Sequence, residues 1–221
     1  MIVGLRYLRG QELLHGKRDL IFAREGIVPM LLVAGAGVLL YRYVSAWLLP
    51  AAVVVLVFMM LLFRDPRRNV PAAALGVVSP ADGTIELVEK TDRCVVQGDA
   101  YHIRIRVNAL GTYTARSPAE GKIMNLRSAE EGVGADCPAN ALWVKTDEGE
   151  SVVLQFQGYR LGLAPRSFLR YGERVGQGHR CAYMRLARYA DVYMPIAGKV
   201  LVEPGQRVRA GTDLIGRLPR A

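Results

Sequence analysis

Residues 184–195 read Met-Arg-Leu-Ala-Arg-Tyr-Ala-Asp-Val-Tyr-Met-Pro, and the second half of this run predicts a β-strand. Apolar and polar side chains alternate there, so that Val192 and Met194 fall on one face, which is the period of two that a strand shows. A proline closes the run. Immediately before the strand lies the pair Ala187-Arg188, on which the functional interpretation of the chain depends.

Short β-type runs also fill residues 64–221, where Gly and Pro are frequent and no long amphipathic helix occurs. This pattern predicts an all-β domain of many short strands. Interleaved hairpins of this kind resemble barrel-sandwich folds, so we expect a barrel-sandwich-like domain. Internal repeats, each typical of a strand end, a Gly-bearing turn and a new strand, support this: Ser79–Ile85 with Ser117–Ile123 and, more loosely, Met194–Val200, and Gly172–Gly178 with Gly205–Gly211.

An almost wholly apolar block precedes this domain at residues 27–63. Its two halves are separated by Tyr41-Arg42-Tyr43, and each is a little short of the roughly 20 residues that span a bilayer as a helix. A transmembrane hairpin of two short helices is the first interpretation. A re-entrant or single bent span, and a buried helical pair in a soluble protein, are the alternatives. Residues 1–26 form a basic N-terminal segment that could contain an interfacial helix.

Positive charge predicts the orientation of the hairpin. Five basic residues precede the apolar block and three arginines follow it closely, whereas only Arg42 lies in the turn. The positive-inside rule therefore places both ends in the cytoplasm. The net charge of +9, beside an apolar anchor, favours an anionic membrane surface over nucleic acid as partner.

The three cysteines, Cys94, Cys137 and Cys181, are widely separated and form no CxxC motif. Three thiols cannot all pair internally, and reduced thiols in a cytoplasmic domain are the simplest interpretation. No metal site is expected.

A series of short motifs, taken in order and spacing, resembles the phosphatidylserine decarboxylases of the short bacterial type. The resemblance covers nearly the whole chain, and it implies a protein of the bacterial inner membrane whose domain faces the cytoplasm. The matching motifs are Phe63-Arg64-Asp65-Pro66, Val77–Gly83, Arg116-Ser117-Pro118 with Gly121, Asn140, Gln157-Gly158, Gly172-Glu173-Arg174, Asp191–Pro195 and Gly205–Val208.

The resemblance also implies a chemistry that this chain departs from. In the family a Gly-Ser pair is cut by the chain itself, and the Ser becomes a pyruvoyl group that forms a Schiff base with the substrate amine. Here that pair is Ala187-Arg188, and a guanidinium cannot yield a pyruvoyl group. Tyr113 replaces the family's His and Gly111 replaces the Asp before it, so the processing site is degenerate.

Asp82 is the catalytic position that matches the family, although a residue in Pro-Ala-Asp-Gly can equally be a plain turn residue. Arg188 could fill the vacated site and pair with Asp82, which would explain how a buried carboxylate is tolerated. His102 lies in an alternating run and is expected on a strand face.

These residues favour a membrane-anchored relative of phosphatidylserine decarboxylase in phospholipid metabolism, unprocessed, without a cofactor, and with a lipid-binding or regulatory role. Its expected partners are membrane phospholipid, with phosphatidylserine among the candidates, and a second copy or an active relative. An active decarboxylase with non-standard residues and a structural membrane interaction module are the alternatives.

Overall fold

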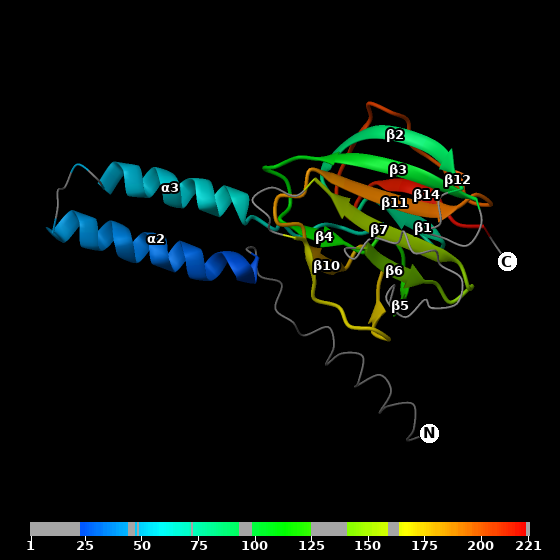
Figure 1. Cartoon of the computed structure of the whole chain (residues 1–221), viewed down its shortest axis with the longest axis horizontal. Coiled ribbons are helices and arrows are strands. Elements are labelled where there is room, and N and C mark those ends of the chain that lie inside the picture. The colour runs from blue at the N-terminus through cyan, green and yellow to red at the C-terminus, as the bar shows by residue number, and fades with distance from the viewer. Residues whose placement is uncertain are drawn as a thin grey trace, which may run out of the picture.

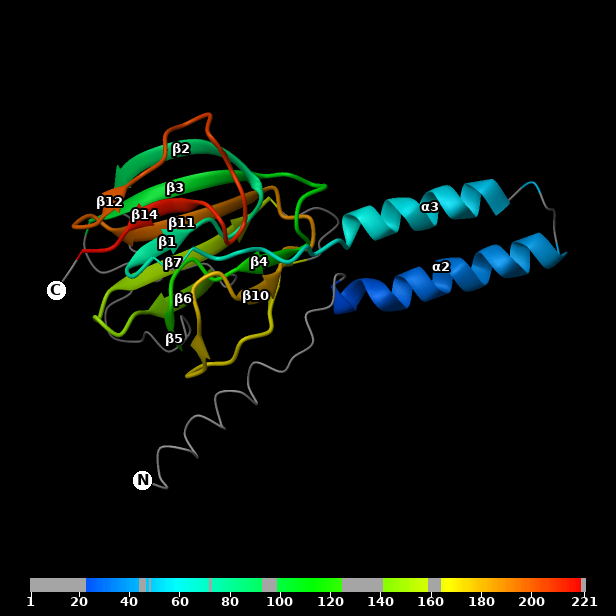
Figure 2. The same ribbon diagram turned by 180° about the vertical axis from the view of Figure 1, so that it is seen from behind.

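Two helices project from one end of a β-rich domain (Figures 1 and 2). The computed structural model describes residues 23–43, 47, 49–71, 73–92, 99–124, 141–158 and 164–219. Helix α2 (Arg24–Tyr43) and helix α3 (Leu49–Leu62) run antiparallel and contact each other along their length. α2 begins inside the segment 1–26 that the sequence assigns to a basic N-terminal region, and the expected interfacial helix lies outside the described residues.

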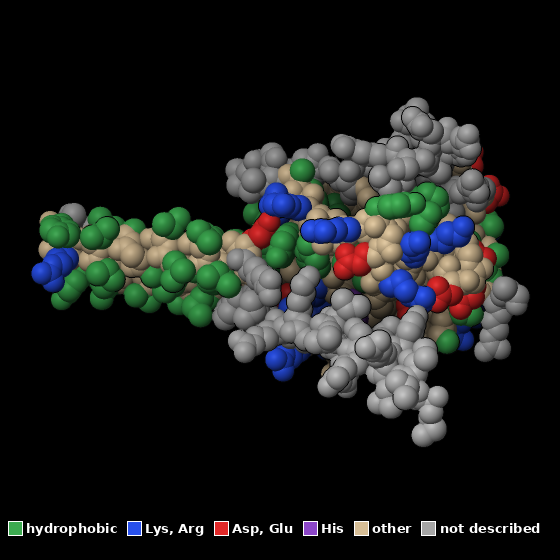
Figure 3. Space-filling view, turned by 90° about the horizontal axis from the view of Figure 1, so that it is seen from below, with side chains coloured by type: hydrophobic (Ala, Val, Ile, Leu, Met, Phe, Trp, Pro, Cys, Tyr) green, Lys and Arg blue, Asp and Glu red, His purple; other side chains and the backbone are tan. Residues whose placement is uncertain are grey.

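The surface of this helical hairpin is hydrophobic almost throughout, whereas basic and acidic side chains are interspersed over the domain (Figure 3). No side chain of α3 is buried, and Gly37 allows close contact between the helices, because a Cβ there would lie 3.0 Å from that of Ala52. By length and composition Glu25–Tyr43 is long and apolar enough to cross a membrane, whereas α3 is a shorter apolar helix.

The domain contains strands and no helix among its described residues, as the sequence predicts. None of its three sheets closes on itself in the described part, so the β-rich sandwich is found without a closed barrel. The strands are β1 (Gly76–Val78), β2 (Gly83–Thr91), β3 (Ala100–Val107), β4 (Thr114–Arg116), β5 (Gly121–Met124), β6 (Ala141–Lys145), β7 (Ser151–Gln157), β8 (Arg166–Ser167), β9 (Arg174–Val175), β10 (Arg180–Tyr183), β11 (Tyr189–Pro195), β12 (Lys199–Val200), β13 (Arg207–Val208) and β14 (Leu214–Arg217).

The largest sheet has the order β13-β2-β3-β11-β7-β6-β5-β9, and the sequence repeats explain its symmetry. Outward from the central pair β11–β7, the order is β3, β2, β13 on one side and β6, β5, β9 on the other. The first repeat leads into β2 and β5, where Ser79 and Ser117 each donate a 2.8 Å hydrogen bond to the carbonyl of the alanine two residues on. The second repeat supplies β9 and β13, so a doubled sequence forms a doubled hydrogen-bond pattern.

Strand β11 lies at the centre of this sheet, between β3 and β7. Val192 and Met194 are fully buried in the main core, as their alternation predicts. The opposite face is covered as well, since Asp191 is fully buried and Tyr193 is 7% exposed. This second face packs Tyr193 with Ala100 and Val153.

The segment after α3 is fixed to the domain by a buried carboxylate. Asp65 is 1% exposed, and it accepts hydrogen bonds from the hydroxyl of Thr114 at 2.6 Å and pairs with Arg180 at 2.8 Å. Arg116 donates to the carbonyl of Pro66 at 3.0 Å. A buried charge is tolerated when it is paired and hydrogen-bonded, so these contacts hold the base of the hairpin against β4 and β10.

Candidate functional site

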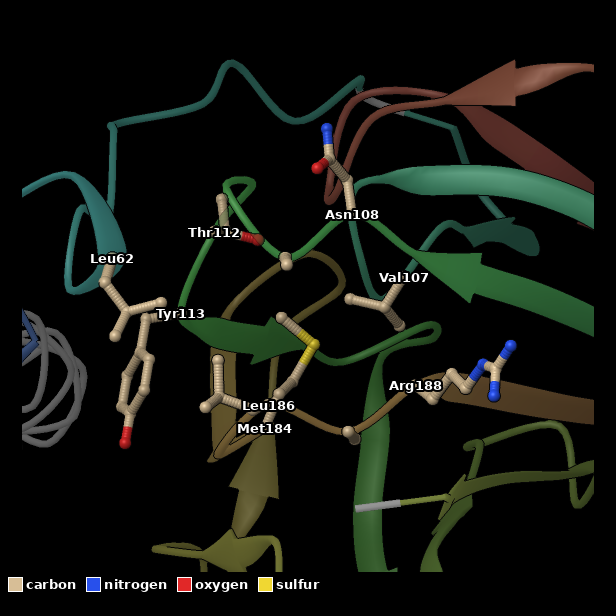
Figure 4. A pocket seen from close by; sticks show the side chains of 10 residues that line it. Leu62, Val107, Asn108, Thr112, Tyr113, Met184, Leu186 and Arg188 are labelled. Atoms are coloured by element: carbon tan, nitrogen blue, oxygen red, sulfur yellow. The ribbon is translucent and has the colours of Figure 1, made fainter. Parts of the chain in front are cut away.

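A cavity of about 90 Å³ lies in the domain beside the last turn of α3. Its walls come from the end of α3, from the connection between β3 and β4, and from the connection between β10 and β11 (Figure 4). The lining is mainly apolar. It consists of Leu62, Val107, Asn108, Ala109, Thr112, Tyr113, Met184, Leu186, Ala187 and Arg188.

Three positions singled out from the sequence, Tyr113, Ala187 and Arg188, line this one cavity although they are far apart in the chain. Pairing of β4 with β10 brings the two connections together. Two backbone hydrogen bonds complete the approach, from Met184 N to Tyr113 O at 3.1 Å and from Val107 N to Arg188 O at 2.9 Å. The tertiary fold therefore brings together three of the positions at which the sequence predicts a departure from the family pattern.

The backbone turns sharply just before Ala187. Arg185 and Leu186 both have positive φ, at 47° and 64°, a region that side chains other than glycine rarely occupy. A hydrogen bond from Ala187 N to Met184 O, at 3.0 Å, closes the turn. Two consecutive residues keep this strained conformation only where neighbouring contacts hold them in place. The contacts of Arg185 with Glu25, described below, hold this turn.

Arg188 lies at the rim of the cavity, with its guanidinium directed away from Tyr113 (Figure 4). The side chain is exposed, and its guanidinium carbon lies 5.5 Å from the centre of the Tyr189 ring, within the range of a cation–π contact. The cation is therefore available at the rim.

Asp82 lies behind the cavity wall and is held by three donors. Its Oδ2 accepts from Arg68 at 2.8 Å and from the backbone N–H of Thr112 at 3.1 Å, and its Oδ1 accepts from the N–H of Ala210 at 2.8 Å. The expected pairing with Arg188 is therefore wrong, because Arg68 supplies the cation. These contacts suit a residue that anchors two turns, whereas a catalytic role for Asp82 stays a prediction.

Gly111 lies against Asp82 and leaves no room for a larger residue. A Cβ at position 111 would lie 2.8 Å from the Cβ of Asp82, closer than real Cβ atoms approach. An aspartate at this position, as the resemblance implies, would require Asp82 to shift and would set two carboxylates side by side.

Tyr113 connects the cavity to the helical hairpin. Its hydroxyl donates to Oε2 of Glu25 at 3.2 Å, and its ring packs on Phe63, with centroids 4.7 Å apart. Burial and the neighbouring Glu25 carboxylate raise the pKa of Tyr113. Arg185 also binds Glu25, through Nε at 3.1 Å and through Nη2. The tyrosine is thus a protonated hydrogen-bond donor to the anchor and is unsuited to act as a base near neutral pH.

Thr112 is the lining residue with an unexplained polar atom. It is 4% exposed, and its hydroxyl has no hydrogen-bond partner among the described residues. Figure 4 shows this oxygen directed into the cavity. A buried polar atom without a partner is costly, and such an atom in a native structure points to a missing water, ion or ligand.

Sequence reasoning missed several residues of the site. Thr112 and Met184 line the cavity, Arg68 neutralises Asp82, and Glu25 with Arg185 holds the hairpin. No local pattern marks them, because each becomes relevant only through a neighbour distant in the chain.

A second titratable cluster lies away from the cavity, on the sheet. His102, on β3 as expected, has Nδ1 3.1 Å from Glu89 and Nε2 3.2 Å from Asp191, and Arg104 Nε donates to Asp191 at 2.8 Å. Burial lowers the pKa of His102, but the two carboxylates outweigh it and the net pKa is raised. Burial likewise opposes ionisation of Asp191, but His102 and Arg104 hold its pKa below the ordinary value.

The sequence predicts no metal site. In the described ranges no group of three or more His, Cys, Asp and Glu side chains could hold a metal ion.

Fold and site together define a β-rich domain whose cavity adjoins the foot of an apolar helical hairpin. A family model described as phosphatidylserine decarboxylase matches residues 55–216, and the chain belongs to the phosphatidylserine decarboxylase family. The phosphatidylserine decarboxylase proenzyme of Nitrosomonas europaea is 34% identical over 203 residues, which cover 86% of this chain and 92% of that protein.

Two further proteins are similar. The proenzyme of the same name from Burkholderia ambifaria is 31% identical over 217 residues, 90% of this chain and 96% of its own. Among solved structures, glucose permease IIA from Mycoplasma capricolum superposes with a TM-score of 0.46 at 18% identity, over 64% of this chain and 94% of that one.

Proposed function

We propose that this protein is a membrane-anchored, unprocessed member of the family that binds phospholipid without decarboxylating it. One observation carries the proposal: Tyr113 and Arg188, which stand where the resemblance implies His and Ser, line the same cavity. Self-cleavage would need a hydroxyl at position 188 to attack the carbonyl of residue 187. The guanidinium of Arg188 supplies none, so the residues present do not fit a pyruvoyl group.

The tyrosine supports the same conclusion. A base near neutral pH needs a pKa close to the ambient value, whereas burial and Glu25 raise the pKa of Tyr113 above its ordinary value of about 10. Its hydroxyl is also engaged by Glu25. The site therefore lacks both a nucleophile at position 188 and a base at position 113.

Membrane anchoring rests on the hairpin. α2 has 20 residues, and at about 1.5 Å per residue it approaches the roughly 30 Å of a bilayer core. α3 has 14 residues and spans about 21 Å, so tilt or local thinning would accompany insertion. We place residues 1–26 and the domain of residues 64–221 on the cytoplasmic side of the inner membrane, with residues 27–63 as the transmembrane hairpin.

The position of the cavity supports lipid binding. Leu62, in the last turn of α3, forms part of its wall, so a lipid in the bilayer would have its head group close to the opening. A role in phospholipid metabolism follows, either through head-group binding or through association with an active relative or a second copy.

Intact mass and lipid binding, measured on the same purified full-length protein, test the proposal. After incubation with detergent and mixed phospholipids we expect one species at 24.3 kDa, no carbon dioxide from phosphatidylserine, and bound lipid in native mass spectra. A C-terminal fragment with a blocked residue near 188 would establish the active decarboxylase instead. A single chain that binds no lipid would favour the structural interaction module.

A further inference from the structure

We propose that the cavity binds the anionic head group of an amine-free phospholipid, recognised by Arg188 at the rim and by the hydroxyl of Thr112 inside. This inference rests on the proposed lipid-binding function and names the class of lipid. It follows from the polarity of the cavity, from the orphaned hydroxyl in its wall, and from the state of the nearby carboxylates.

The cavity has an apolar end and a cationic end. Leu62 lies at the end of the hairpin helix, and Leu186 and Met184 line the middle, whereas Arg188 lies at the opposite side (Figure 4). A phospholipid entering from the bilayer would approach along the apolar side and bring its head group toward Arg188. The apolar end of the cavity thus faces the hairpin and the cationic end lies away from it, as a membrane lipid requires.

Thr112 supplies the second recognition element. Its hydroxyl is buried, directed into the cavity and without a partner among the described residues. A hydroxyl can donate to a phosphate oxygen, and doing so would satisfy the orphaned group. Asn108 also lines the cavity, but its amide is directed away from it (Figure 4), and its Oδ1 accepts a hydrogen bond from the backbone N–H of Leu110 at 3.2 Å.

An ammonium group finds no counterpart in this lining. None of the lining residues is acidic. The two carboxylates that bind lining residues already have cationic partners, because Asp82 binds Arg68 and two backbone N–H groups and Glu25 binds Arg185 and Tyr113. Beside the guanidinium of Arg188, an amine would be repelled, whereas a phosphate gains a charge-assisted hydrogen bond.

The test compares lipids of identical acyl chains by native mass spectrometry of the full-length protein in detergent. We expect phosphatidic acid to bind most tightly, phosphatidylglycerol at least as tightly as phosphatidylserine, and phosphatidylcholine about tenfold more weakly than phosphatidylglycerol. Inorganic phosphate and glycerol phosphate form the soluble arm. We expect neither to compete at concentrations at which phosphatidylglycerol does.

Variants test whether Arg188 and Thr112 bind the lipid head group. Arg188→Gln should weaken phosphatidylglycerol binding about tenfold. It should change phosphatidylcholine binding much less, because losing the phosphate contact is offset by losing the repulsion of the ammonium, whereas Arg188→Lys should retain most of the phosphatidylglycerol binding. Thr112→Val removes the orphaned hydroxyl, so it should weaken binding without lowering the melting temperature. Arg174→Gln, on the exposed edge strand β9 outside the cavity lining, is the matched control and should have no effect.

The outcomes separate this inference from the proposed function. Lipid binding that ignores the head group and Arg188→Gln, or that prefers phosphatidylserine over phosphatidylglycerol, would overturn the inference and leave a lipid-binding protein. Soluble phosphate binding as tight as lipid binding would overturn the assignment to a membrane lipid. Absence of all lipid binding would overturn the proposed function itself.

Discussion

The hydroxyl of Tyr113 donates a hydrogen bond to the carboxylate of Glu25, 3.2 Å away, and so joins the β domain to the first turn of helix α2. Arg185, next to the sharp turn before Ala187, binds the same carboxylate. The position that the resemblance assigns to a histidine thus serves here as an attachment point between the cavity and the hairpin.

Glu25→Gln should loosen this attachment, because the guanidinium of Arg185 loses its charged partner. The two side chains are 25% and 23% exposed, so solvent screening limits the loss to about 1 kcal/mol. Hydrogen exchange of the full-length protein should show amides in the first turn of α2 and in residues 183–187 exchanging about fivefold faster. Asp147→Asn is the matched control, since it breaks the exposed pair with Arg174 and should leave these amides unchanged. Unchanged exchange in Glu25→Gln would show that the Asp65 contacts and apolar packing hold the hairpin without this ion pair.

The sheet cluster of His102 and Asp191 should make stability depend on pH. Folding raises the pKa of His102, so its contribution is fully present below the unfolded pKa of about 6.5 and is lost as pH rises through the folded pKa. The melting-temperature advantage of wild type over His102→Gln should therefore shrink as pH rises above about 6.5. Glu89→Gln, which removes one of the two carboxylates, should reduce this pH dependence. A constant difference between pH 5 and 9 would refute it, because this interval contains the whole range, about pH 5 to 8, in which histidine changes its charge.

The contribution of Asp191 to stability depends on pH in the opposite direction from that of His102. Folding lowers its pKa, so its contribution is present above the unfolded value of about 3.9 and is lost as pH falls through the folded pKa. Asp191→Asn leaves His102 and Arg104 without their shared carboxylate and should cost about 3 kcal/mol near neutral pH. Urea unfolding measures this cost, and a loss below about 1 kcal/mol would mean that water reaches both His102 and Arg104.

Topology can be tested with single reporters placed on the two sides. Trp47, between the helices, is 90% exposed, so Trp47→Cys should react with an impermeant thiol reagent in intact cells. Asp147→Cys, at a 63% exposed side chain of the domain, should react only after lysis. Cys181 is buried, and burial raises its pKa to about 12, so it should stay silent in the folded protein. Labelling of Asp147→Cys, Cys94 or Cys137 from outside would refute the cytoplasmic placement.

Restoring the processing site should restore partial self-cleavage. Ala187→Gly with Arg188→Ser supplies the flexible bond and the hydroxyl, and Tyr113→His supplies a group that titrates near neutral pH. We expect cleavage in this triple variant and none in Arg188→Ser alone, because nucleophile and helper act as a unit. Fragment yield over hours on a gel, with a check for a blocked N-terminus, measures it.

Position 111 provides a control for the same experiment. The family pattern suggests adding Gly111→Asp, but the approach to Asp82 leaves no room for it. The quadruple variant should therefore fold less stably and cleave no better than the triple variant. Cleavage in Arg188→Ser alone would show that another group already acts as the base, and a folded but inert triple variant would show that the site has changed beyond these positions.

Local patterns in the sequence were enough to predict the β-rich domain, the strand at Asp191–Pro195 and the family. Strand periodicity and turn glycines are local properties, so each short segment specifies its own strand. The repeats Ser79–Ile85 and Ser117–Ile123 also correspond to the symmetric strand order of the large sheet. The pair Ala187-Arg188, where the resemblance implies Gly-Ser, is equally visible in the sequence, because the surrounding motifs fix the register.

Which side chains come into contact depends on how the elements pack, and local sequence does not predict it. Asp82 pairs with Arg68 rather than with Arg188, and the choice depends on how the segment after α3 crosses the domain. Thr112 is a loop residue that no local sequence pattern marks, yet its hydroxyl is buried in the cavity wall without a hydrogen-bond partner among the described residues. Contacts between residues as distant as Glu25 and Arg185 follow from the packing of whole elements, and no local pattern encodes them.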